Sequence, residues 1–143
     1  MASREYLIRQ IEEMGIFLAL LLRKILKMKE ENQQEQMESA VKEALTKELD
    51  LDIEQILMLE NAEFLEIANK QFSCDAQLEK LADILKVLGS ETGSSLTLTR
   101  ANYLRKALFL YAKLQESSTD FSFERKIKIE ELQEILRVHG LME

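Results

Sequence analysis

The stretch SCDAQLEKLADILKVLG, residues 73–89, decides the fold class of this chain. Apolar side chains recur along it three and four positions apart, which is the spacing of one face of an α-helix. We expect Ser73 to cap the start of this helix and Gly89 to end it as a residue with positive φ. The predicted buried face consists of Leu78, Leu81, Ala82, Leu85 and Leu88.

The same spacing continues on both sides of this stretch. The 143 residues include no proline and only four glycines, so little interrupts helix formation. We therefore predict an all-α protein with a single domain, 1–143, and about seven helices. Antiparallel helical hairpins are expected, in a tetratricopeptide-like array or an irregular bundle. The predicted helices cover residues 3–29, 37–49, 53–59, 61–68, 73–89, 99–115 and 122–139.

Polar residues mark the ends of several predicted helices. Ser3 is a suitable N-cap for the first helix, and Asp50 or Asp52 for the short helix that follows residue 52. Asn61 is expected to cap the next one, and Gly140 to close the last. Residues 90–97 are rich in Gly, Ser and Thr and predict a mobile loop.

Four short stretches carry a family resemblance: DIEQILML at 52–59, FLEI at 64–67, DFSFE at 120–124 and IEEL at 129–132. They resemble a family of small, uncharacterised, all-helical bacterial proteins, and the similarity covers most of the chain. The resemblance implies a tetratricopeptide-like helical array in the C-terminal half. It implies no activity, cofactor or binding residue, because the family has none to carry over.

The charge and the rare residue types limit the class of function. Nineteen basic and 26 acidic residues give a net charge of −7, which repels nucleic acid and anionic lipid. Cys74 and His139 are the single cysteine and the single histidine, so they form neither an internal disulfide nor a Cys/His zinc site. The apolar run 14–22 is too short to span a membrane. We expect a cytoplasmic protein without nucleic-acid or membrane partners.

A search for catalytic chemistry finds none. Asp50, Asp52 and Glu54 alternate as the first ligands of a calcium loop do, but Gln55 and Asn61 stand where that loop needs glycine and glutamate. His139 falls in the last turn of a helix, where a cation interacts with the helix dipole. We therefore predict no catalytic residue, no metal site and no cofactor.

The first predicted helix has apolar residues on two sides. Ile16 and Leu20 lie in the middle of its charged face. They either pack against a second copy of the chain, with Phe17 and Tyr6 at the rim, or lie between other helices of a chain in which this helix is central. The main apolar stripe consists of Leu7, Ile11, Met14, Leu18, Leu22 and Ile25.

The sixth predicted helix has an aromatic residue in a basic patch. An exposed Phe flanked by Lys and Arg can dock an acidic peptide or a helix. The alternative is that another helix of the same chain covers Phe109 and that the Lys and Arg stems pack beside it. The patch consists of Asn102, Arg105, Lys106, Phe109 and Lys113.

These patterns favour a non-enzymatic helical module for protein–protein interaction, with a homodimer through the first helix as one form of it. The alternative is a small-ligand-binding protein or enzyme with a pocket between helices, using carboxylates and Tyr103 or Tyr111. Membrane association through the first helix is disfavoured by Glu12 and Glu13 on its polar face. The predicted partner-binding residues are Ile16, Leu20, Arg105, Lys106, Phe109 and Lys113.

Overall fold

The computed structural model describes residues 2–90 and 97–141, and within these ranges it contains seven helices and no strand. This confirms the predicted all-α class. Most of the predicted loop 90–97 lies outside the described residues. The helices are α1 (Ala2–Glu30), α2 (Gln34–Leu49), α3 (Ile53–Met58), α4 (Asn61–Gln71), α5 (Asp75–Gly89), α6 (Leu98–Ser117) and α7 (Phe123–Val138).

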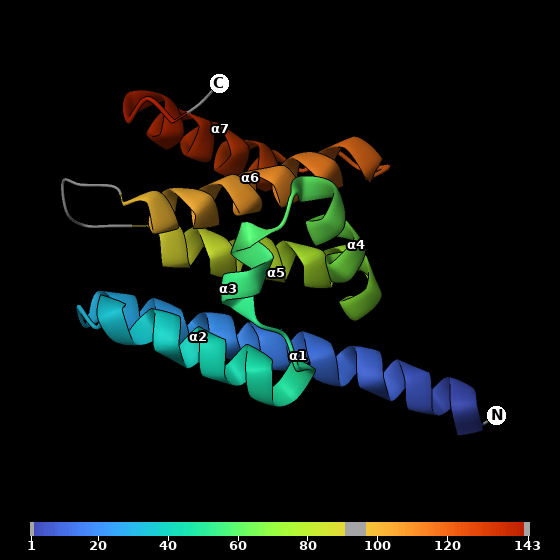
Figure 1. Ribbon diagram of the computed structural model, residues 1–143. Coiled ribbons are helices and arrows are strands. Elements are labelled where there is room, and N and C mark those ends of the chain that lie inside the picture. Colours follow the sequence, from blue (N-terminus) through green and yellow to red (C-terminus); the bar gives the residue numbers. More distant parts are fainter. Residues whose placement is uncertain (1, 91–96, 142–143) are drawn as a thin grey trace.

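The helices stack in layers around α5 (Figure 1). On one side α5 packs against α6, which in turn packs against α7. On its other side α5 packs against α1, and α2 lies alongside α1. The short helices α3 and α4 connect α2 to α5 and both contact α6. The N-terminal end of α1 extends past the end of α2, as Figure 1 shows.

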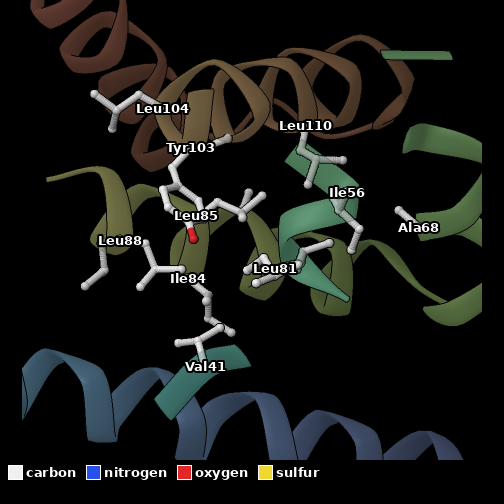
Figure 2. Packing of buried hydrophobic residues seen from close by; sticks show 14 of the residues in the cluster. Val41, Ile56, Ala68, Leu81, Ile84, Leu85, Leu88, Tyr103, Leu104 and Leu110 are labelled. Carbon is white, nitrogen blue, oxygen red and sulfur yellow. The ribbon is translucent and has the colours of Figure 1, made fainter. Parts of the chain in front are cut away.

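The centre of the core is α5, and its predicted apolar face is buried. Ile84 and Val87, outside that face, are also buried, because α5 has neighbours on two opposite sides. Figure 2 shows Leu85 beside Tyr103 of α6, whereas Ile84 points the other way, towards Val41 of α2. A helix that is apolar on most of its circumference is typical of a core position.

Gly89 has a different role from the one predicted. It is the last residue of α5, and its φ is not positive. A Cβ atom at this position would lie 2.6 Å from the Leu104 side chain and 2.9 Å from the carbonyl oxygen of Arg100. Glycine is required here because α5 and α6 approach each other closely, and the predicted positive φ is wrong.

The predicted helix ends were partly wrong. The N-cap of α5 is Cys74 rather than Ser73, and that of α4 is Glu60 rather than Asn61; neither makes a side-chain cap hydrogen bond. Ser3 lies inside α1, which begins one residue earlier. Asn61 instead accepts a hydrogen bond from Lys106 of α6, 45 positions away.

Other helix ends follow the expected capping chemistry. Asp52 caps α3 by accepting a hydrogen bond from the N–H of Glu54 (3.0 Å), whereas Asp50 ends α2 in the left-handed region. Gly140, with φ of 69°, closes α7 as predicted. There the N–H of Leu141 donates to the Leu136 carbonyl oxygen (2.7 Å), which is the hydrogen bond of a Schellman motif.

Candidate functional site

Ile16 and Leu20 lie on the solvent-facing side of α1. Each is 59% exposed, whereas Leu18 and Ile25, on the opposite side of the same helix, are fully buried. The prediction that other helices of this chain cover Ile16 and Leu20 is therefore wrong. More generally, α1 contributes half of the fourteen large apolar side chains that are exposed in the described part of the chain.

The first half of α1 extends beyond the core. Leu7 and Ile11, predicted to be buried in the main stripe, are exposed because α1 extends past the ends of its neighbours (Figure 1). Together with Phe17 they line an open groove of about 550 Å³ between α1, α2 and the start of α5. The carboxylates of Glu13 and Glu48 also line this groove.

Gln77 attaches α1 to the start of α5. Its side chain is only 3% exposed. The amide nitrogen donates to the Ile11 carbonyl oxygen (3.0 Å), and the amide oxygen accepts from the N–H of Ser73 (3.2 Å). A buried amide with both ends paired adds stability and fixes the position of α1 relative to α5. The sequence did not reveal the bond between Gln77 and Ile11, because these two residues lie 66 positions apart.

The predicted basic patch on α6 is divided between two environments. Lys106 is buried, and its Nζ donates to the Leu59 carbonyl oxygen (2.5 Å) and to Asn61 Oδ1 (2.9 Å). The same Nζ lies 5.4 Å from the centre of the Phe64 ring. Burial lowers the pKa of Lys106. Its role is to hold the α3–α4 turn against α6, so its prediction as a partner-binding residue is not supported.

Two further residues of the patch, Arg105 and Phe109, line a second groove, of about 580 Å³. Phe109 is half-buried, with its ring centre 6.2 Å from that of Phe64 on α4, so the covering of Phe109 by another helix is partly realised. Lys113 lies over the Phe109 ring at 5.9 Å. Arg105 lines the groove and donates to the Leu141 carbonyl oxygen (3.0 Å).

A charged network that sequence analysis did not find joins α5 to α7. Arg125 of α7 is only 8% exposed and donates twice to Glu79 Oε1, at 3.0 and 2.7 Å. Lys128 contacts Glu79 Oε2 (3.2 Å) and Asp83 Oδ1 (2.9 Å). Burial alone would raise the pKa of Glu79, but the hydrogen bonds from Arg125 and Lys128 outweigh it and lower that pKa. The network is a structural fastener between helices.

Tyr103 and Tyr111, the tyrosines of the ligand-pocket hypothesis, belong to the core. The Tyr111 hydroxyl donates to the carboxylate of Asp83 and so belongs to the same network. Burial raises the pKa of both hydroxyls. Neither tyrosine lines either of the two grooves described above.

The outward face of α1 and the two grooves are thus the candidate functional surfaces of an all-α bundle. Within the described ranges, no group of three His, Cys, Asp or Glu side chains is placed to hold a metal ion. Among the same residues, no helix combines the length and apolar character needed to cross a membrane. Comparisons with protein-family models, curated proteins and solved structures find no match, so the family resemblance stays a prediction.

Proposed function

We propose that this protein is a non-enzymatic interaction module that forms a homodimer through the outward face of α1, defined by Ile16 and Leu20. The observation that carries the proposal is the exposure of both side chains in the middle of the longest helix. Removing apolar surface from water contributes about 25 cal/mol per Å². A symmetric contact would bury both residues on both chains without a further partner.

The same proposal places the protein in the cytoplasm. Cys74 is the single cysteine and is exposed. A lone exposed thiol remains reduced in that compartment, whereas an oxidising one favours intermolecular disulfides. The pairing of two copies through α1 needs no disulfide.

The substitution Leu20→Glu tests the dimer. It places a charge in a contact from which water is excluded. In light scattering we therefore expect the variant to be a folded monomer and the parent to be a dimer. Met58→Glu is the matched control, because Met58 is 84% exposed on α3, and this variant should remain dimeric. Circular dichroism checks that each variant is folded. A monomeric parent at high protein concentration, or a dimeric Leu20→Glu variant, would contradict the proposal.

The alternative function is binding of a small apolar ligand in the groove beside α1. It is supported by the volume of that groove, which falls within the range of about 300–1,000 Å³ usual for ligand pockets. Titration with the neutral dye Nile red tests it. Saturable binding that Ile11→Glu abolishes and Met58→Glu preserves would support a ligand site, whereas no saturable binding would count against it.

A further inference from the structure

The charged residues beside Ile16 and Leu20 are arranged in opposite signs. Glu12 and Glu13 precede this pair, and Arg23 and Lys24 follow it at equal spacing from Leu18. All four charged side chains are exposed, and none makes an ion pair with another described residue. The outward face of α1 is therefore acidic at one end and basic at the other, with apolar residues between.

The positions around the helix decide how two such faces fit. At about 100° per residue, Glu13 and Lys24 lie on one side of the line that runs through Ile16 and Leu20. Glu12 and Arg23 lie on the other side. In a two-fold antiparallel pair, each edge of a helix meets the same edge of the other helix with its direction reversed.

From this arrangement we infer that the second copy packs antiparallel, with the two α1 helices crossing midway between Ile16 and Leu20. Glu13 then meets Lys24 of the partner subunit, and Glu12 meets Arg23 of the partner subunit, so the symmetric dimer has four ion pairs. A parallel pair in register would instead place Glu12 against Glu13 of the partner subunit, so that like charges face each other. This inference rests on the proposed homodimer and adds its orientation and register.

Two further residues limit the length of the contact. Arg9 and Lys27 lie on the line through Ile16 and Leu20, so the antiparallel arrangement brings like charges towards each other at both ends. Ile16 and Leu20 form an i, i+4 ridge, and two such ridges pack at a crossing angle of about −50°. At this angle the helices diverge before Arg9 and Lys27 meet. The contact is a short crossing rather than a long coiled coil.

The ion pairs select the orientation, and the apolar pair supplies most of the affinity. Ion pairs at a solvated rim contribute little to affinity. Like charges placed opposite each other weaken an interface much more, which is how charge patterns reject wrong pairings. Reversing one end of the face should therefore have a larger effect than neutralising it.

Two charge-reversal variants test the register. One combines Glu12→Lys with Glu13→Lys, and the other combines Arg23→Glu with Lys24→Glu. Each variant alone places four like-charge contacts in its own dimer, so we expect its dissociation constant to rise about tenfold or more at low salt. In an equimolar mixture all four contacts become attractive again, so light scattering should show a heterodimer.

Glu35→Lys combined with Glu43→Lys is the control. It makes the same change in net charge as Glu12→Lys with Glu13→Lys, but on exposed residues of α2, and should dimerise like the parent. If both reversal variants dimerise like the parent, or if folded variants fail to pair when mixed, the antiparallel register is wrong while the dimer itself stands. If the parent is monomeric, the proposed function fails first, and the two failures are thus distinguishable.

Discussion

The helices α5 and α1 have similar sequence patterns but different environments. Both have an apolar stripe with three- and four-residue spacing. In α5 almost every apolar side chain is buried, because α6 covers one side and α1 the other. In α1 the buried side chains among the described residues lie only in the second half, from Leu18 onwards. Half of the exposed large apolar side chains of the described residues lie on α1. An apolar stripe predicts a buried face only where another element covers it.

The largest expected effect of a single substitution is at the centre of α5. Leu85→Ala removes a fully buried side chain beside Tyr103 (Figure 2) and leaves a cavity. We expect a loss of about 2–5 kcal/mol in the free energy of unfolding. Chemical denaturation measures this loss. A loss below about 0.5 kcal/mol, the range of surface substitutions, would mean that α5 is not the core helix.

A smaller effect is expected where α5 meets α7. Glu79→Gln leaves the buried Arg125 and half-buried Lys128 without their shared carboxylate, and we expect a loss of about 2–3 kcal/mol. The substitution Glu134→Gln removes an exposed ion pair with Arg137 and should change stability much less. Equal effects of the two substitutions would show that the α5–α7 network adds nothing beyond a surface pair.

The same network predicts the direction of the pH dependence. The pKa of Glu79 in the folded protein is below its ordinary value of 4.5, so the unfolded chain binds this proton more readily. The contribution of Glu79 to stability is therefore complete above that ordinary pKa and is lost as the pH falls through the folded pKa. Unfolding curves in the acid range should show this loss for the parent and less of it for Glu79→Gln. The same slope in both proteins would contradict the assignment.

The two helices also differ at their glycines, where the predicted effects are smallest and opposite in sign. Gly89→Ala places a Cβ against Leu104 and a backbone carbonyl oxygen, so we expect a loss of about 1–3 kcal/mol. Gly15→Ala in α1 meets no atom within 4 Å and should stabilise the helix by about 0.5–1 kcal/mol. Thermal unfolding of both variants compares them directly. A loss at Gly15 would indicate a neighbour on that side of α1.

The helices of this chain are more predictable from the sequence than their ends. The apolar face of α5, the all-α class and the cap at Asp52 are predicted correctly, because each depends on neighbouring residues along one helix. Asn61 and Ser73 are wrongly predicted as caps. The Asn61 side chain accepts a hydrogen bond from Lys106 of α6, a partner that only tertiary packing brings close. The N-cap of α5 lies one residue later than predicted, and Gln77 in the first turn accepts a hydrogen bond from the backbone N–H of Ser73.

The candidate site was predictable in the same limited sense. A helical wheel places the apolar pair Ile16 and Leu20 on the charged side of the helix, and the structure shows both residues exposed. The burial of Lys106 was not recognisable, because a lysine within a basic patch has the same local pattern whether it faces solvent or the α3–α4 turn. Only the position of the turn beside α6 distinguishes the two.

Helical periodicity, the lack of proline and the charges of α1 are properties of the chain order, so the sequence determines them before any packing occurs. The order of charges along α1 is one of these properties, and the inferred register depends on it. Which stripes become core is decided by the tertiary structure, because burial requires a second surface brought close from far along the chain. For α5 the fold provides two such surfaces, and for the outward face of α1 the residues that the structure describes provide none.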